Sequence, residues 1–123
     1  MSNVLSHWLE NYTITRNFEY KDGVHIVLWH KHWIALYIKD NVVDFFDSFG
    51  RPPIHFMLRF KGKHVIVHSK RLQHDESNVC GYYCLAFIYM KLKGNLSQFF
   101  QMFSEDKRLN DFKVVQFVHM LLT

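Results

Sequence analysis

Three strand-like segments that lie close together in the sequence constrain the fold most. Residues 24–29, 32–39 and 42–47 are rich in β-branched and aromatic residues, and only Asp40 and Asn41 separate the second segment from the third. Asp and Asn tolerate the positive φ values that a two-residue hairpin turn requires. We therefore predict that residues 32–39 and 42–47 form an antiparallel hairpin.

Helical patterns follow these strands. A further strand is predicted at 64–68, after a short helix that Pro52 or Pro53 would start. Gly94 should end a strongly apolar helix at 79–93, for which Ser77 or Asn78 is the expected cap. Three more helical segments are expected: a short one after Ser2 or Asn3, one at 96–103, and one at 111–122.

Length and composition favour one packed domain over residues 1–123. Of the 123 residues, 49% are apolar and only 21% charged, as in a folded globule. No apolar run reaches the roughly 18 residues that a membrane span needs, and we expect no signal peptide. The net charge of +4 is compatible with a polyanion, but no Lys/Arg block supports one. The order of elements predicts an α+β fold with a mixed or antiparallel central sheet flanked by helices.

Two cysteines four residues apart, Cys80 and Cys84, exclude a disulfide scaffold. Cys80 falls at the start of the predicted apolar helix, where free N–H groups and the helix dipole favour a thiolate. Cys84 lies one turn later and should pack in the core. Zinc bound by both cysteines with His30 and His32 is the alternative, but His-x-His on a strand is not a common structural zinc site.

A thiol nucleophile needs a base, and the hairpin register helps to choose it. With a two-residue turn, Asp47 lies opposite Ile34 and diagonal to His32 on one face of the sheet. Asp44 falls on the other face and is expected at the surface. The sequence therefore predicts that Asp47 orients His32 as the base for Cys80, unless a longer loop shifts the register.

The strings His32-Trp33, Asp47-Ser48-Phe49-Gly50, Gln73 and Cys80-Gly81 resemble the site of adenain-like cysteine proteases. These belong to the ubiquitin-like (SUMO-type) protease superfamily, whose chain order of His, Asp or Glu, Gln, Cys is a permutation of the papain order. The tail beyond Cys80 is most similar to the proteases of Maverick/Polinton elements and adintoviruses. The resemblance covers about residues 24–122 and implies a papain-like core of the circularly permuted type.

The resemblance also implies a role for each matching residue. Cys80, His32 and Asp47 would form the catalytic triad, and Gln73 would donate to the oxyanion beside the backbone N–H of Cys80. Trp33 would clamp a narrow, Gly-containing substrate segment, although a core position is an equal alternative. Gly81 would let the substrate backbone approach closely.

Cleavage after Gly in capsid or core precursor proteins, during virion maturation, is the expected function. We expect a monomer with polypeptide substrates, located inside the host cell in the nucleus or the virion, without a membrane or metal. No cofactor is required, although DNA or a viral peptide could act as an activator. The chain departs from adenain in its shorter length and in having Asp47 in place of Glu. Because no cysteine precedes Cys80, activation through a disulfide cannot be carried over.

Two other functions remain open. A SUMO or ubiquitin-like deconjugating protease would share the chemistry but needs an extended surface for a folded modifier. The non-enzymatic alternative is an α+β interaction module in which Cys80 and the histidines are structural.

Overall fold

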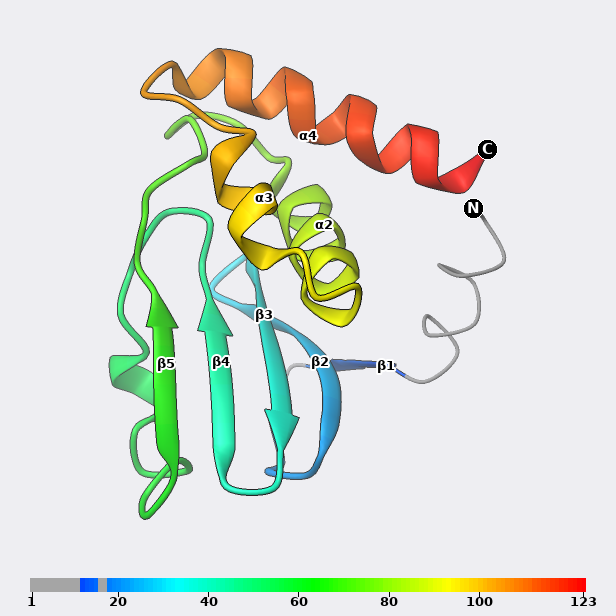
Figure 1. Ribbon diagram of the computed structural model, residues 1–123. Helices are drawn as coiled ribbons and strands as arrows, with labels where there is room; N and C mark the ends of the chain where they lie inside the picture. The colour runs from blue at the N-terminus through cyan, green and yellow to red at the C-terminus, as the bar shows by residue number, and fades with distance from the viewer. Residues whose placement is uncertain (1–11, 16–17) are drawn as a thin grey trace.

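The computed structural model describes the backbone of residues 12–15 and the chain from residue 18 to residue 123. The described residues form a five-stranded mixed sheet in which the strands follow chain order (Figure 1). The strands are β1 (Tyr12–Thr15), β2 (Gly23–Trp29), β3 (His32–Lys39), β4 (Val42–Phe46) and β5 (His64–His68). β3 is antiparallel to both of its neighbours, β2 and β4, while at the two edges β1 pairs in parallel with β2 and β5 pairs in parallel with β4. The fold is therefore α+β, as predicted, although β1 was not anticipated.

The predicted hairpin register between β3 and β4 is confirmed. Lys39 pairs with Val42 and Ala35 pairs with Phe46. Only the first turn residue, Asp40, has a positive φ (56°), so the expectation that Asn41 would share this conformation is wrong. The register places Asp47 immediately after the last paired residue of β4.

The described helices agree with the predicted ones in number and differ at their ends. They are the short 3-10 helix η1 (Ile54–Phe56) and the α-helices α2 (Cys80–Leu92), α3 (Leu96–Gln101) and α4 (Lys107–Leu122). α4 begins earlier than predicted because the Asp106 side chain caps it by accepting from the N–H of Leu109 (3.1 Å). The helix expected near Ser2 lies outside the described residues.

The expected caps of α2 are not used. Its N-cap residue is Val79, and no described side chain caps the helix there. The Ser77 hydroxyl instead donates to the carbonyl of His74, within the preceding loop. α2 thus begins without a side-chain cap. Gly94 ends the helix with a φ of +76°, as predicted.

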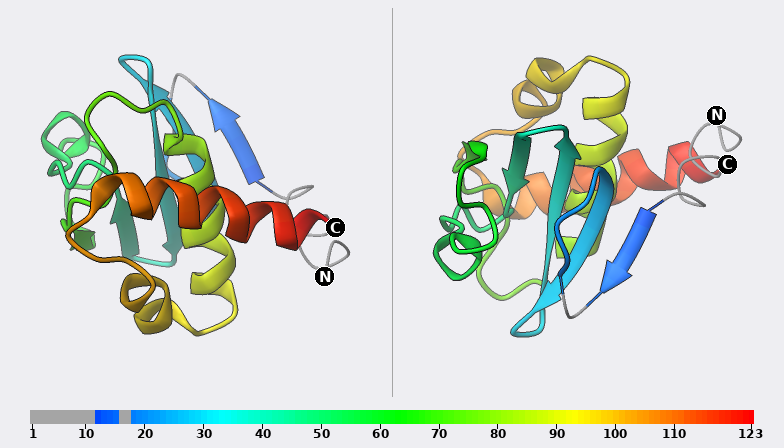
Figure 2. Two further views of the ribbon diagram at one scale, coloured as in Figure 1. Left: turned by 90° about the horizontal axis from the view of Figure 1, so that it is seen from above. Right: turned by 90° about the horizontal axis from the view of Figure 1, so that it is seen from below.

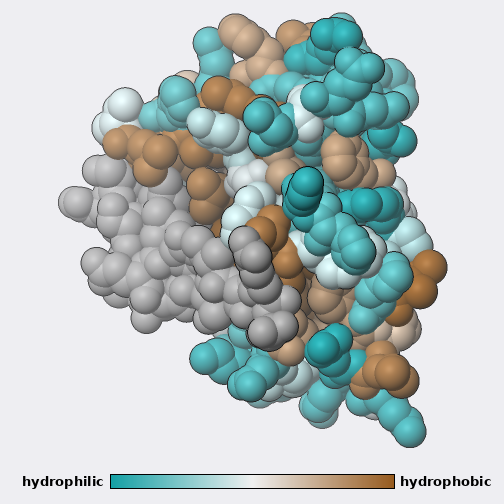
Figure 3. Space-filling view, turned by 180° about the vertical axis from the view of Figure 1, so that it is seen from behind, coloured by the Kyte–Doolittle hydropathy of each residue, from teal (hydrophilic) through white to brown (hydrophobic). Residues whose placement is uncertain are grey.

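Two apolar clusters cover the two faces of the sheet. α2, α3 and α4 lie on one face (Figures 1 and 2), and α2 is so enclosed there that Tyr83, Cys84 and Phe87 have no exposed surface. On the opposite face, Phe56 and Phe60 pack against the sheet. Burial of each such large apolar side chain contributes about 1.5 to 3 kcal/mol. Seen from the back, most of the described surface is hydrophilic, with apolar patches between polar residues (Figure 3).

Asp44 is not a surface residue, so that prediction is wrong. Its exposed fraction is 3%, and its carboxylate binds His68 (3.1 Å) on β5 and Lys91 (3.0 Å) on α2. Asp44 lies on the face of β4 that the helical layer covers, and Asp47 lies on the other face. A carboxylate on that face is therefore buried and paired instead of solvated.

Candidate active site

Cys80 is the first residue of α2 and lies beside the start of β3. The backbone N–H of Trp33 donates to its Sγ at 3.4 Å. Burial raises the pKa of Cys80, but the interactions with His32 and with the backbone N–H groups of Trp33 and Gly81 outweigh it, so the pKa is lowered. The side chain is 6% exposed. This environment favours the thiolate, which is the nucleophilic form of cysteine.

His32 joins Cys80 to Asp47. Its Nε2–H donates to Asp47 Oδ1 at 2.7 Å, which leaves Nδ1 as the ring nitrogen that can exchange a proton with the thiol. Burial lowers the pKa of His32, but its bonds to Asp47 and Cys80 dominate, and the pKa is raised. A raised imidazole pKa next to a lowered thiol pKa favours a thiolate–imidazolium pair.

Each oxygen of Asp47 has a donor. Oδ1 accepts from His32 and from the backbone N–H of Phe49 (2.8 Å), and Oδ2 accepts from Arg51 Nε (3.0 Å). Burial raises the pKa of Asp47, but these donors outweigh it, with His32 first among them, and the pKa is lowered. The carboxylate is 2% exposed, so these bonds fix its orientation and keep it charged.

Phe49 and Arg51 take part in the site, although no role was predicted for either from the sequence. The Phe49 ring stacks on His32, with ring centroids 4.5 Å apart and planes at 23°. The Arg51 guanidinium carbon lies 5.4 Å from the centre of the Phe49 ring. In the sequence, Phe49 was indicated only by its place in the string Asp47-Ser48-Phe49-Gly50, and Arg51 only by its position four residues after Asp47. Both contacts depend on the tight turn at Gly50.

Gln73 is buried in the loop before α2 and has three side-chain bonds. Its Oε1 accepts from the Ser48 hydroxyl at 2.6 Å. Its Nε2 donates to the carbonyl (3.1 Å) and to the hydroxyl (3.0 Å) of Ser77. Gln73 is therefore no solvated loop amide, since its exposed fraction is 0%. The amide is well ordered, but both of its hydrogens are directed toward Ser77.

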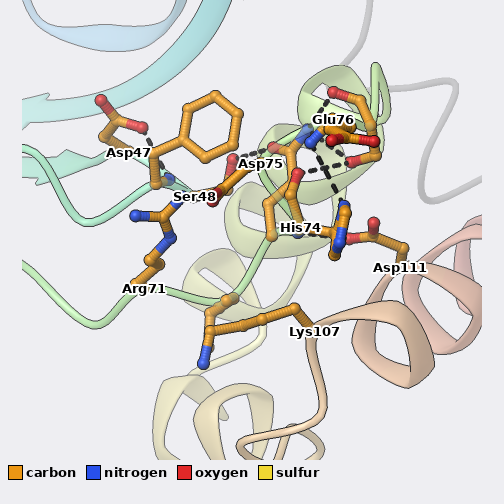
Figure 4. A network of polar contacts seen from close by, with 12 residues as sticks. Asp47, Ser48, Arg71, His74, Asp75, Glu76, Lys107 and Asp111 are labelled. Atoms are coloured by element: carbon orange, nitrogen blue, oxygen red, sulfur yellow. Dashed lines mark hydrogen bonds and ion pairs between the residues drawn. The ribbon is translucent and has the colours of Figure 1, made fainter.

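α4 anchors the loop that carries Gln73. Asn110 Nδ2 donates to the carbonyl of Leu72 (3.1 Å), and Asp111 accepts from the N–H of His74 and from the Tyr83 hydroxyl (2.7 Å). Burial, and then Asp111, raise the pKa of Tyr83, which stays a neutral donor. Figure 4 shows Asp47, Ser48 and Arg71 at one end of this polar network and His74 and Asp111 at the other.

The remaining predicted residues lie as follows. Trp33 is half-buried against the helical core, and its Cδ1 would be 3.8 Å from a Cβ added at Gly81. The two residues therefore adjoin each other at Cys80. Cys84 is fully buried, as predicted, and burial raises its pKa, which keeps it a neutral thiol.

The sequence matches no protein-family model, and no curated protein matches it at a significant level. Within residues 18–123, no three His, Cys, Asp or Glu side chains are grouped as a metal ion would require. No helix in the described part of the chain is long and apolar enough to cross a membrane.

Proposed function

We propose that this protein is a cysteine endopeptidase in which Cys80 is the nucleophile, His32 the general acid and base, and Asp47 the residue that orients His32. The observation that carries the proposal is the 2.7 Å bond from His32 Nε2 to a buried, fully bonded Asp47, together with opposite shifts in the pKa values of His32 and Cys80. A buried structural cysteine would instead have a raised pKa, as Cys84 does.

In the first half of the reaction, the Cys80 thiolate attacks the carbonyl carbon of the peptide bond. The C–N bond then breaks, and the imidazolium of His32 gives its Nδ1 proton to the leaving amine. The product of this step is a thioester between Cys80 and the new carboxyl end of the substrate. Asp47 keeps the proton on Nε2 and stabilises the positive charge of the ring.

In the second half, neutral His32 removes a proton from a water molecule that attacks the thioester. The C–S bond breaks, the carboxylic acid leaves, and the Cys80–His32 pair is restored. The oxyanion of each tetrahedral intermediate needs donors. We propose the backbone N–H of Cys80 and Nε2 of Gln73, which must exchange one of its bonds to Ser77 for one to the oxyanion.

The resemblance to adenain-like proteases extends this proposal to the fold and to the substrate. Chain order of the site residues, and a helix that begins at the nucleophile, support a papain-like core of the circularly permuted type. We propose cleavage after Gly in capsid or core precursors of a virus or a Maverick/Polinton element, inside the host cell. DNA or a viral peptide is proposed as an activator only.

Selective alkylation tests the nucleophile. Iodoacetamide should label the folded protein at Cys80 and leave Cys84 intact, because Cys84 is fully buried with a raised pKa. The pKa of Cys80 lies below its ordinary value, so labelling should persist from mildly alkaline to neutral pH. His32→Ala should slow labelling at neutral pH about tenfold or more, because the thiol pKa rises when its partner is lost.

Mass spectrometry of the labelled protein reads out the site and the rate, and Cys84→Ala serves as the control for the other thiol. Equal labelling of both cysteines, or rates that do not depend on His32, would remove the basis for the proposal and favour the interaction module. Hydrolysis of modifier conjugates without hydrolysis of any short peptide would favour the deconjugating protease instead.

A further inference from the structure

Basic residues dominate the chain between the catalytic acid and the loop that carries Gln73. Residues 48–74 contain no Asp or Glu and six Lys or Arg residues: Arg51, Arg59, Lys61, Lys63, Lys70 and Arg71. Two of them, Arg51 and Arg71, reach the active site. The guanidinium carbons of both lie over the Phe49 ring, at 5.4 and 5.6 Å from its centre.

Arg51 is held in one orientation by three contacts. Its Nε donates to Asp47 Oδ2 at 3.0 Å, and its guanidinium packs on the rings of Phe49 and Trp29, the latter at 5.6 Å. Its side chain nevertheless remains 44% exposed. An arginine that is already ordered loses little conformational freedom when it binds a ligand.

The terminal nitrogens of Arg51 remain available. Within the part of the chain that the structure describes, the only hydrogen bond or ion pair of Arg51 is the one from Nε to Asp47. Its two Nη groups therefore present donors to solvent. Arg71 differs, because its Nη2 forms an ion pair with the exposed carboxylate of Asp75. Arg51 is thus the main cation available to a ligand, and Arg71 adds a positive charge that Asp75 partly neutralises.

The position of Arg51 relative to His32 indicates which part of a substrate it meets. In the proposed reaction His32 protonates the leaving amine, so the residues after the cleaved bond must lie on the His32 side of Cys80. Phe49 stacks on His32, and Arg51 lies on Phe49. An extended chain advances about 3.5 Å per residue, so the stretch from His32 across Phe49 to Arg51 corresponds to the first three residues after the bond.

We propose that Arg51, assisted by Arg71, forms an anion subsite that selects peptides with an acidic side chain within three residues after the cleaved bond. The substrate carboxylate would accept from the free Nη groups of Arg51 while Nε stays bound to Asp47. This inference rests on the proposed peptidase function and deepens it, since it names the substrate class of the same site.

Matched fluorogenic peptides test the subsite. Peptides that differ only in Glu, Gln or Lys at each of the three positions are compared by kcat/KM in the wild type, Arg51→Gln and Arg59→Gln. Arg59 is an exposed residue of the same basic segment outside the Phe49 contacts, so its variant changes the net charge equally. We expect the wild type to prefer Glu over Gln by about five- to thirtyfold at one position, with a smaller ratio in high salt.

Arg51→Gln should bring this ratio close to one, whereas Arg59→Gln should keep it. The ratio is informative even if Arg51→Gln also lowers the overall rate through Asp47. A ratio near one in the wild type, or an unchanged ratio in Arg51→Gln, overturns the anion subsite while leaving the peptidase function standing.

A second measurement does not depend on peptide hydrolysis. Cys80 is alkylated with anionic iodoacetate and neutral iodoacetamide, and the ratio of the two rates is compared between the same variants. Arg51→Gln should lower the iodoacetate-to-iodoacetamide ratio about two- to fivefold at low salt, and Arg59→Gln should not. If no peptide is cleaved, the peptidase proposal fails, and an unchanged alkylation ratio would then overturn the anion subsite separately.

Discussion

At the scale of single residues, the Gln73 amide is buried and held by three side-chain hydrogen bonds. Its oxygen is held by Ser48 and its nitrogen by Ser77, inside a loop with no exposure of the amide. These bonds fix the plane of the amide before a substrate arrives. Only one of the two bonds to Ser77 has to be exchanged for a bond to the oxyanion, so the amide needs little reorganisation during the reaction.

Gln73→Ala should therefore lower kcat about ten- to a thousandfold, with a smaller effect on KM. The variant also leaves the Ser48 hydroxyl without its buried acceptor, which should lower the free energy of unfolding by about 1 to 3 kcal/mol. Steady-state kinetics on a cleaved peptide, together with urea unfolding, separate the two effects.

Ser77→Ala is the matched control, because it perturbs the same loop and keeps both the amide and its bond to the Ser77 carbonyl. We expect this variant to retain most of its turnover. Similar losses in the two variants would indicate that the loop conformation matters and the Gln73 amide does not.

The positions of some of these side chains could be predicted from the sequence, and those of others could not. The pairing of His32 with Asp47 was predictable because a two-residue turn fixes which residues of the two strands lie on the same face of the sheet. Asp44 was misplaced because strand alternation identifies a face and does not reveal what covers that face. The partners of Gln73 could not be predicted, since Ser48 is 25 residues away and meets it only through the folded loop.

At the scale of elements, the turn after β4 joins the two halves of the site. Gly50 has a φ of +73°, and its N–H donates to the carbonyl of Asp47 at 2.8 Å. A Cβ added at Gly50 would lie 2.6 Å from the backbone oxygen of Ser69 and 3.0 Å from the N–H nitrogen of Arg71. The loop toward Gln73 therefore crosses this turn at a distance that only glycine permits.

Gly50→Ala should lower the free energy of unfolding by more than the roughly 1 to 2 kcal/mol that a left-handed conformation costs a residue with a Cβ. It should also reduce turnover, because the backbone shift displaces Asp47 and Gln73 relative to Cys80. Denaturant unfolding and peptide hydrolysis measure the two effects.

Gly62→Ala provides the comparison for this substitution. Gly62 has a similar φ of +79°, but an added Cβ would meet nothing within 4 Å. The difference between the two variants thus isolates the close approach at Gly50 from the conformational strain. Equal destabilisation, or full activity in Gly50→Ala, would contradict the role of this crossing.

The elements themselves were largely predictable, and their ends were not. β3 and β5 have the predicted bounds because short alternating segments between turn residues leave little choice. The start of α2 came within one residue of the prediction, yet its expected caps, Ser77 and Asn78, do not cap it. Ser77 instead bonds to the loop and to Gln73, and that competition is visible only in the folded chain.

At the scale of the whole molecule, the Asp44 carboxylate joins the sheet to the helical layer. From β4 it binds His68 on the edge strand and Lys91 on α2, and it is 3% exposed. Burial raises the pKa of Asp44, but the bonds to His68 and Lys91 outweigh it, and the pKa is lowered. The ionised form therefore stabilises the assembled layers, in which these three elements meet.

The sign of the pH dependence follows from this lowered pKa. A carboxylate whose pKa is lower in the folded state contributes stability above its unfolded pKa near 3.8, and the contribution is lost as the pH falls through the folded pKa. Asp44→Asn should lower the free energy of unfolding by about 1 to 3 kcal/mol at neutral pH. The difference from the wild type should shrink as the pH falls below about 4, where Asp44 of the unfolded chain begins to take up a proton. It should disappear only at the lower pH at which Asp44 of the folded protein is protonated too.

Urea unfolding of both proteins across this pH range measures the difference directly. Asp40→Asn is the control, because Asp40 is an exposed carboxylate at the hairpin turn and Asn also tolerates its positive φ. That variant should change the free energy of unfolding by less than about 0.5 kcal/mol at any pH. If Asp44→Asn were equally destabilising at neutral and acidic pH, its effect would come from altered packing, and the charge of Asp44 would not hold the layers together.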